Sequence, residues 1–265
     1  KSGVRIIFTV DCGTLSYEPI SAAKKDKVDV IVLDHHQSDI KLPDAYAIVN
    51  PNRYDDNSNL NYLCAAGVCF MTLVSINSNL RNQNWFTKNK IKEPNLLNFL
   101  DLVTLGTICD VVPLIGLNRA IVKQGLKIIN LKKNLGLKTL IDICRIETKT
   151  SVYHLGYVIG PRINAGGRVG KCSHGANLLL NTNPKESFQI ATELEKFNSE
   201  RKKLEKDLLN IALNTLKENI NDPVLVLYGY QWHEGVIGII AARIKEKFNK
   251  PTIIISINNK IGKAS

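Results

Sequence analysis

The early part of the chain alternates short apolar runs with segments of helical spacing. Apolar runs at 6–10, 30–33 and 47–49 predict buried strands. A helix is predicted between the first two runs, at 17–27. Because strands that alternate with helices form parallel sheets covered on both faces, this part of the chain is predicted to be an α/β domain.

Helical spacing dominates the middle of the chain. Apolar residues recur at helical spacing or density in four segments. The predicted helices are 65–75, 96–106, 118–131 and 137–144. Between the first two, residues 78–95 are rich in Asn and Lys and are predicted to form a mobile surface loop. A glycine-rich stretch at 156–175 follows the last of them.

The final part of the sequence predicts a charged connector and a second domain. Residues 187–219 are highly charged with Leu and Ile at helical spacing, and the Asn-Asp-Pro at 221–223 ends this helix. Beyond it, strands at 224–228 and 252–257 flank a helix at 236–248. We interpret the charged helix as the link between two domains, the second of them incomplete.

Composition and charge narrow the class of protein. With 265 residues, 44% of them hydrophobic, the chain can bury a sizeable core as one large domain or two smaller ones. Lys and Arg number 35 against 24 Asp and Glu, and the formal charge of +11 favours a polyanionic partner such as nucleic acid. On charge alone, a solvated lysine-rich surface is an equally good explanation. No apolar run is long enough to span a bilayer.

The cysteines and the chain ends add two expectations. The six cysteines show no CxxC or zinc-ribbon spacing and fall mostly in apolar stretches, so we predict reduced core residues of a cytoplasmic protein. The chain has no cleavable signal and opens directly into the strand-like residues 4–10. It stops at 262–265 just after a strand, so we expect a fragment truncated at both ends.

Candidate chemistry comes from aspartates at the ends of predicted elements. Asp11 and Asp34 follow strands, and Asp110 lies in the segment 105–113, into which the helix predicted at 96–106 runs. A buried aspartate needs a backbone cap or a cation, and for any single one a cap is the commoner explanation. Together they favour a metal, because carboxylates with the imidazoles of His35 and His36 suit Mn²⁺, Mg²⁺ or Zn²⁺. Adjacent side chains on a strand point to opposite faces, so the two histidines are expected to have different roles.

Two glycine-containing segments are candidates for phosphate binding. Arg162 and Arg168 flank small residues and Asn164, which would let a phosphate backbone approach two guanidinium groups. A surface turn with solvated arginines explains this spacing equally well. His233 lies in a turn just before a predicted helix, whose N-terminal amides can receive a phosphate. Its neighbour Trp232 either stacks on a base or packs in the core.

Other polar residues have ordinary explanations beside functional ones. The charged connector carries residues that either line a DNA path or form a solvated helix face: Asn198, Arg201, Lys202 and Lys203. His154 and His174 are interpreted as structural or surface residues. Thr14 and Thr107 are interpreted as turn and packing residues, because hydroxyl groups often bond only to the local backbone.

Five motifs occur together in the order found in one known family. They lie at 9–13, 33–36, 105–114, 160–168 and 232–241. On these motifs the chain resembles the DHH phosphoesterases along nearly its whole length, and the last two look like the branch of bacterial single-strand-specific DNA exonucleases. The resemblance implies an α/β fold in which a parallel-sheet DHH domain is linked by a long helix to an incomplete DHHA1-like α/β domain. The implied limits are 1–185 for the DHH domain, 186–221 for the connecting helix and 222–265 for the substrate-binding domain.

The resemblance also implies roles for the candidate residues. Two Mn²⁺ or Mg²⁺ ions are expected, with Asp11 and Asp110 similar to the metal-bridging aspartates and His35 similar to the histidine ligand. His36 is similar to a residue that touches the substrate phosphate, and Asp34 resembles a residue that orients an imidazole. The implied substrate-binding residues are His36, Arg162, Asn164, Arg168 and His233.

The activity implied is 5′ to 3′ hydrolysis of single-stranded DNA in repair and recombination, by a cytoplasmic monomer with a helicase or single-strand-binding protein as candidate partner. The same metal residues would serve a pyrophosphatase, or a phosphodiesterase of short oligonucleotides or cyclic dinucleotides. The basic charge and the arginine-glycine block favour a longer nucleic acid. A noncatalytic DNA-binding scaffold is a further alternative, which the intact Asp11, His35, His36 and Asp110 argue against.

One departure from the family pattern limits what this chain is expected to do alone. The family's first metal motif, an Asp-x-Asp pair, has no counterpart upstream of Asp11. We therefore expect the chain to bind metal weakly and to hydrolyse DNA slowly or not at all. Without the strand that should carry this motif, apolar sheet surface is expected to stay unpaired. Such a surface favours aggregation.

Overall fold

The computed structural model describes residues 3–216 and 221–265. They form two compact units: one runs to Lys133 and includes Thr148–Gly156, and the other contains Asn134–Glu147 and continues from Tyr157. Each unit contains a β-sheet with helices, so the predicted α/β class is confirmed. The domain limits at 1–185, 186–221 and 222–265 stay predictions. No described helix has the length and apolar character needed to cross a membrane.

The first unit begins with the predicted parallel sheet. Its strands, in spatial order, are β1 (Ile6–Val10), β2 (Asp29–Leu33) and β3 (Ala47–Val49), and α1 (Tyr17–Lys25) connects the first two. Val10 lies opposite Leu33, and Leu33 lies opposite Val49. Because these registers align the last residue of each strand, the residue that follows each strand leaves the sheet at the same edge.

The edge strand β1 is apolar and exposed to solvent. Among the described residues β1 pairs only with β2, and Ile6, Phe8 and Val10 are 51%, 59% and 54% exposed. The predicted unpaired apolar surface is therefore present. The buried core of the sheet lies elsewhere, where Ile20 of α1 packs with Val30 and Val32 of β2.

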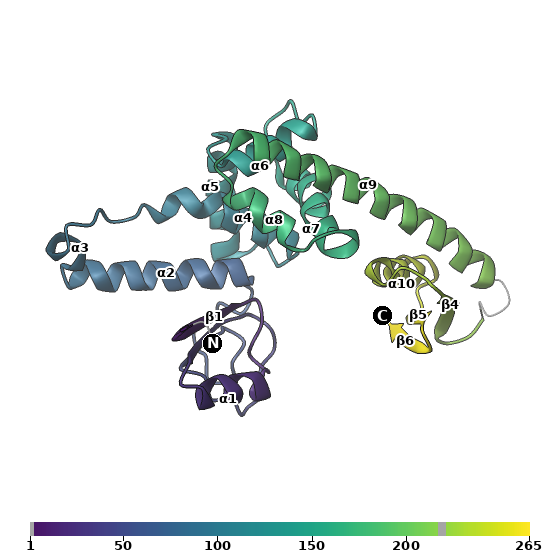
Figure 1. Cartoon of the computed structure of the whole chain (residues 1–265), viewed down its shortest axis with the longest axis horizontal. Helices are drawn as coiled ribbons and strands as arrows, with labels where there is room; N and C mark the ends of the chain where they lie inside the picture. Colours follow the sequence, from purple (N-terminus) through teal and green to yellow (C-terminus); the bar gives the residue numbers. More distant parts are fainter. Residues whose placement is uncertain (1–2, 217–220) are drawn as a thin grey trace. The chain divides into compact units, whose positions relative to one another are not determined.

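The rest of the first unit is helical. Its elements are α2 (Ala65–Asn82), α3 (Trp85–Lys88), the 3₁₀ turn η1 (Leu96–Phe99), α4 (Leu100–Cys109) and α5 (Gly116–Asn130). The loop predicted at 78–95 is wrong over its first part, because α2 continues to Asn82 and α3 follows it, whereas residues 89–95 lie outside helices and strands (Figure 1). The weak helix propensity of asparagine is overridden by tertiary contacts. Asn77 donates a hydrogen bond of 2.7 Å to Glu93, and Arg81 pairs with the same carboxylate.

The helices of the second unit include the glycine-rich block. They are α6 (Leu135–Ile143), α7 (Gly160–Val169), α8 (Ser173–Leu180) and α9 (Pro184–Thr215), and the π-helical turn η2 (His154–Ile159) leads into α7. The surface turn considered at 162–168 is wrong, since these residues are helical. Small residues serve packing here: a Cβ on Gly166 would lie 2.9 Å from the Lys171 carbonyl oxygen. The last residues of the helix predicted at 187–219 lie outside the described part of the chain.

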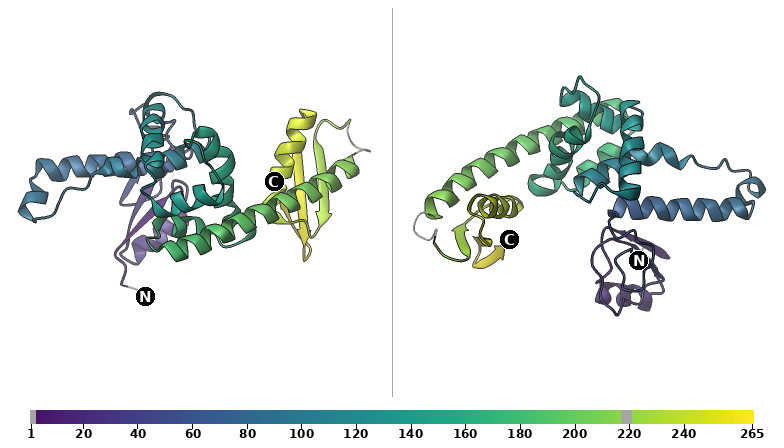
Figure 2. Two further views of the ribbon diagram at one scale, coloured as in Figure 1. Left: turned by 90° about the horizontal axis from the view of Figure 1, so that it is seen from above. Right: turned by 180° about the vertical axis from the view of Figure 1, so that it is seen from behind.

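The second unit also contains the second sheet. β4 (Leu225–Tyr230) and β5 (Thr252–Asn258) are parallel, and β6 (Ile261–Ala264) adds to β5 in the antiparallel direction. Figure 2 shows α10 (Glu234–Phe248) along one face of this sheet, where Ile240 and Ile254 are fully buried. The sequence did not predict β6, because every residue of this short strand is exposed and no apolar alternation marks it.

Candidate metal centre

Two acidic residues leave the first sheet from neighbouring strands. Asp11 comes directly after β1 and Asp34 directly after β2. The Asp11 N–H still donates to the Leu33 carbonyl, at 3.0 Å, but its φ of +62° turns the chain out of the sheet. Gly13 completes the turn at φ +118°, where a Cβ would lie 2.6 Å from the Thr9 hydroxyl oxygen. This position therefore requires glycine.

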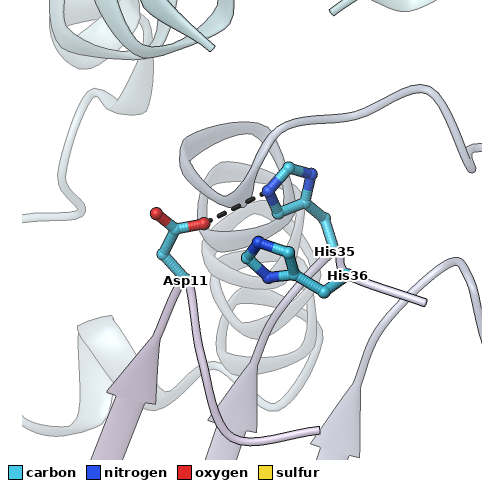
Figure 3. Close-up of side chains that lie close together, drawn as sticks. All are labelled: Asp11, His35 and His36. Carbon is cyan, nitrogen blue, oxygen red and sulfur yellow. Dashed lines mark ion pairs between the residues drawn. The ribbon is translucent and has the colours of Figure 1, made fainter. Parts of the chain in front are cut away.

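The His35 imidazole lies between two carboxylates. Its Nε2 atom is 3.2 Å from Asp11 Oδ1 and 3.4 Å from Asp110 Oδ2. Figure 3 shows Asp11 and His35 facing each other, with the His36 ring beside them. The His35 side chain is only 15% exposed, whereas that of Asp11 is 63% exposed. The cluster thus has a shielded imidazole and an acidic side that is open to solvent.

Asp110 reaches this cluster from the end of a helix. It is the C-terminal cap of α4, which continues the helix predicted at 96–106 as far as Cys109. α4 is apolar around most of its circumference. A short apolar segment of this kind has no helical periodicity to distinguish it from a buried strand. Burial raises the pKa of the Asp110 carboxyl, His35 opposes this, and the charge of Asp11 adds to it. The next residue, Val111, has a φ of +57°, which is unusual for a β-branched side chain.

Asp34 is a buried carboxylate that organises the residues around it. It accepts hydrogen bonds from the Thr14 N–H at 3.1 Å, the Thr14 hydroxyl at 2.7 Å and the His35 N–H at 2.8 Å. It also accepts from the His36 N–H at 3.3 Å, and the His36 ring Nδ1 lies 2.7 Å from Asp34 Oδ1. Burial alone would raise the pKa of Asp34, but these hydrogen bonds hold it well below the ordinary value. Asp34 is therefore ionised and orients an imidazole.

The two neighbouring histidines face different partners. His36 hydrogen-bonds to Asp34, whereas His35 faces Asp11 and Asp110. The hydrogen bond to Asp34 raises the pKa of His36, and its side chain is 61% exposed. The cationic form of His36 is therefore favoured at a position that solutes can reach.

The donor set fits a divalent cation. One ligand atom each from Asp11, His35 and His36 lies within 4.8 Å of the others, and Asp110 approaches the same His35 nitrogen. Carboxylate oxygen with imidazole nitrogen is a combination that Mn²⁺ and Zn²⁺ bind, and Mg²⁺ binds through the carboxylates. Two carboxylates that approach one imidazole also concentrate negative charge, which a cation would neutralise.

Sequence reasoning missed two asparagines that contact the centre. Asn50 follows β3 and is 3% exposed, and Asn52 lies two residues beyond it. The Asn50 amide donates to the Thr14 hydroxyl at 2.8 Å, and the Asn52 amide donates to the His35 carbonyl at 2.5 Å. Thr14 was interpreted only as a turn residue, yet it joins Asn50 to Asp34. The sequence did offer one signal: Asn50 directly follows the third predicted strand, as Asp11 and Asp34 follow the first two.

The predicted phosphate-binding residues lie in the second unit. Arg162 pairs with Glu195 and donates to the Val158 carbonyl at 2.7 Å, so its charge is already compensated. Asn164 and Arg168 are exposed on the same helix, α7. Arg168 donates to the Gly235 carbonyl at 3.1 Å, which brings it to the N-terminus of α10.

His233 is the N-cap of α10. Its Nδ1 accepts a hydrogen bond of 3.1 Å from the Gly235 N–H, and the predicted turn before this helix is confirmed. Trp232 is partly buried against the core of this unit, so the core explanation fits it better than base stacking. The structure therefore brings Arg168 and His233 to the same helix end.

The polar residues of α9 divide into two groups. Asn198 is 1% exposed, and Arg201 donates to it and to Glu205. Asn198 is therefore buried away from any DNA path, and the partly buried Arg201 is engaged by Asn198 and Glu205. Lys202 and Lys203 are exposed and keep the solvated-face explanation.

The remaining histidines, threonines and cysteines can also be assigned. His154 accepts from the Ser151 N–H, and His174 pairs with Glu193, as expected of structural residues. Thr107 is a packing residue that donates to the Val103 carbonyl at 2.7 Å. All six cysteines are free, but Cys12 and Cys172 are exposed, which corrects the expectation of core cysteines.

Comparison with known proteins identifies the class. Residues 5–107 match the family described as "DHH family, N-terminal domain". This segment contains β1, β2, Asp11, His35 and His36, and it ends just before Asp110. Over these residues the chain is similar to the DHH family.

Within that class, the chain is similar to RecJ. It is 40% identical to the single-stranded-DNA-specific exonuclease RecJ of Escherichia coli over 258 residues, which is 95% of this chain and 45% of the relative. The RecJ of Bacillus subtilis is 30% identical over 268 residues, 99% of this chain and 32% of the relative. The chain thus spans less than half the length of these relatives.

Solved structures agree with this assignment. A crystal structure of Thermus thermophilus RecJ in complex with Mn²⁺ matches 95% of this chain and 36% of its own, with a TM-score of 0.80 and 30% identity. A Mg²⁺ complex of the same relative matches 95% of this chain and 34% of its own, with a TM-score of 0.68 and 29% identity. The similarity to RecJ therefore extends from sequence to fold.

Proposed function

We propose that this chain carries the catalytic site of a metal-dependent exonuclease that hydrolyses phosphodiester bonds of single-stranded DNA from 5′ to 3′ in repair and recombination. The convergence of Asp11, His35 and Asp110 carries this proposal, because they come from a strand, a second strand and a helix to one small volume. The similarity to RecJ supports the choice of substrate.

Each residue of the centre has a role in the proposal. Asp11, His35 and Asp110 would hold metal as part of a site for two divalent ions, Mn²⁺ or Mg²⁺. A bound ion supplies a water of lowered pKa and positive charge next to the phosphate. His36 contacts the scissile phosphate, since the hydrogen bond to Asp34 favours its cationic form. Asp34 keeps the His36 ring in place and itself stays ionised.

Substrate binding in the second unit is assigned to the residues around two helix ends. Arg168 and His233 meet at the N-terminus of α10, where backbone N–H groups favour a phosphate. Asn164 is exposed one turn earlier on α7. Arg162 belongs to the same block, but it can bind a phosphate only by giving up Glu195, so Arg168 carries more of the proposed binding.

The cellular setting follows from the same resemblance. We propose a cytoplasmic monomer that binds single-stranded DNA and cooperates with a helicase or a single-strand-binding protein. The net charge of +11 and the free cysteines support the DNA partner and the reducing compartment respectively.

The test is a cleavage assay with single-stranded DNA labelled at its 3′ end. This chain is expected to digest slowly or not at all, so the assay also uses a longer version carrying the flanking segments of the E. coli relative. We expect Mn²⁺-dependent release from the 5′ end that Asp110→Ala abolishes, while DNA affinity and thermal stability change little.

The outcomes separate the alternatives. Digestion that continues unchanged in Asp110→Ala would refute the metal assignment. Faster hydrolysis of dinucleotides than of long strands would favour a phosphodiesterase of short oligonucleotides. Binding of DNA and Mn²⁺ by the longer version without any cleavage would favour the noncatalytic scaffold.

A further inference from the structure

The three parallel strands of the first sheet end in one row, and each is followed by a polar residue. Val10, Leu33 and Val49 are in register, so the residues after them are neighbours along one edge. Two of these followers are Asp11 and Asp34. The third, Asn50, has no role in the function proposed above.

The Asn50 side chain is buried with its whole amide hydrogen-bonded. Its residue is 3% exposed, and its amide nitrogen donates to the Thr14 hydroxyl at 2.8 Å and to the His36 carbonyl at 2.9 Å. Its amide oxygen accepts from the Asn52 N–H at 2.8 Å. The amide therefore has a single orientation. Reversing it would place its oxygen against the His36 carbonyl and its NH₂ group against the Asn52 N–H.

The hydrogen bonds converge on Asp34, from Asn50 through Thr14 on one side and from the His36 ring on the other. The Thr14 hydroxyl has one proton and gives it to Asp34 Oδ2 at 2.7 Å, so it must accept from Asn50. The other oxygen of Asp34 accepts from His36 Nδ1. The His36 ring is 61% exposed, so this chain of hydrogen bonds is its main restraint and fixes the proton on Nδ1.

The same asparagines hold the main chain of both histidines. Asn50 binds the His36 carbonyl, and Asn52, which is itself bound to Asn50, binds the His35 carbonyl at 2.5 Å. The orientation of a ligand imidazole depends on such supporting contacts. Loss of Asn50 would therefore release both rings while removing no atom that faces Asp11.

We infer that Asn50 is a positioning residue of the metal centre, which fixes the tautomer of His36 and, through Asn52, the position of His35. This inference rests on the proposed function, because it assigns those rings to metal and phosphate. The Asn50 amide contacts Thr14, Asn52 and the main chain of His36, so its role in the centre is to position other residues.

The test compares Asn50→Leu with Asn130→Leu. Asn130 is a matched control, since its amide also donates to two acceptors, the Leu126 and Thr150 carbonyls, and accepts from the Thr150 N–H. The first measurement is the ¹⁵N spectrum of His36 in metal-free protein at a pH where the ring is neutral. The second is the affinity for Mn²⁺ alone, followed by electron paramagnetic resonance.

In the unmodified chain we expect one His36 tautomer, with the proton on Nδ1. Asn50→Leu should average the two ring-nitrogen signals and weaken Mn²⁺ binding about tenfold. Asn130→Leu should lower the unfolding midpoint by a similar amount without changing either readout. If Asn50→Leu does not fold, Thr14→Val breaks the same chain of hydrogen bonds with an isosteric side chain and should change the tautomer in the same way.

The inference is overturned if Asn50→Leu, or Thr14→Val in its place, lowers stability but leaves the tautomer and the Mn²⁺ affinity unchanged. Neither readout requires DNA cleavage. Failure of the proposed function, seen as cleavage that survives Asp110→Ala, is therefore distinguishable from failure of the role assigned to Asn50.

Discussion

A single buried carboxylate, Asp34, organises the residues of the candidate centre. It fixes the turn at Thr14 and the ring of His36, and its own charge survives burial because every partner donates a hydrogen bond to it. Hydrogen bonds to a charged acceptor are stronger than neutral ones, which makes such a residue an effective anchor. The two histidines that follow it therefore differ in environment although they are adjacent in sequence.

Replacing Asp34 by Asn should lower the pKa of His36. In the unmodified chain the hydrogen bond to Asp34 raises this pKa, so the stability that it contributes is full below the unfolded pKa of histidine. That contribution is lost as the pH rises through the higher folded value. NMR titration of the His36 ring in metal-free protein measures the shift.

Asp44→Asn serves as the control, because Asp44 is an exposed carboxylate paired with Lys24 and should leave the His36 titration unchanged. An unaltered His36 titration in folded Asp34→Asn would contradict the assigned hydrogen bond.

At this scale the sequence identified the reactive residues better than the residues that hold them in place. Asp11 and Asp34 were recognisable because both follow apolar strands, and acidic residues there are costly without a partner. Asn50 follows a strand as well, but asparagine before proline is an ordinary strand end, and its hydrogen bonds to Thr14 and His36 depend on strand register. That register is a property of the folded sheet.

At the scale of elements, the sequence distinguished helices from strands where its apolar residues followed a regular pattern. β1 and β3 have the bounds that the sequence predicted. The helix predicted at 96–106 was recognised but its end at Cys109 was not, because α4 is buried on most sides, which weakens the periodicity that would mark its end. The helix continuing from 78 to 82 was hidden by its asparagines, whereas Glu93 holds the neighbouring Asn77 and Arg81 in helical positions.

The turn after β1 should not tolerate a side chain at Gly13. Gly13→Ala would place a Cβ 2.6 Å from the Thr9 hydroxyl oxygen at a φ of +118°. We expect a loss of about 1–3 kcal/mol in the free energy of unfolding, because backbone strain of this kind has that cost. Urea unfolding followed by circular dichroism measures it.

Gly167→Ala is the matched comparison. Gly167 lies within α7, and its added Cβ would meet only an ordinary contact of 3.9 Å with Cys172. This change should stabilise the chain by roughly 0.5–1 kcal/mol. Equal effects of the two substitutions would contradict the tight turn at Gly13.

On the scale of the whole molecule, the excess of basic residues is the property most relevant to a nucleic-acid partner. The formal charge is +11, and the comparisons relate the chain to exonucleases of single-stranded DNA. Charge alone did not distinguish such a partner from a solvated surface, because it says nothing of where the lysines lie. The fold class was predictable because it depends on the order of strands and helices.

Binding of single-stranded DNA should be strongly salt-dependent. Neutralising a few phosphates releases counterions, so the affinity should fall roughly tenfold or more between low and moderate salt. Fluorescence anisotropy with a labelled oligonucleotide, in EDTA to prevent cleavage, measures this. Arg168→Gln should reduce the salt slope, whereas Arg53→Gln, at an arginine already paired with Asp55, should leave the slope unchanged. An affinity that is independent of salt would contradict a phosphate-directed interaction.

The central claim is that Asp11, His35 and Asp110 form a binding site for a divalent cation. Its most direct test is a Mn²⁺ titration of this chain followed by electron paramagnetic resonance, with Asp11→Asn, Asp110→Asn and the control Asp44→Asn. We expect each of the first two substitutions to weaken Mn²⁺ binding roughly tenfold or more and Asp44→Asn to leave it unchanged. Equal Mn²⁺ affinity in all four proteins would contradict the account.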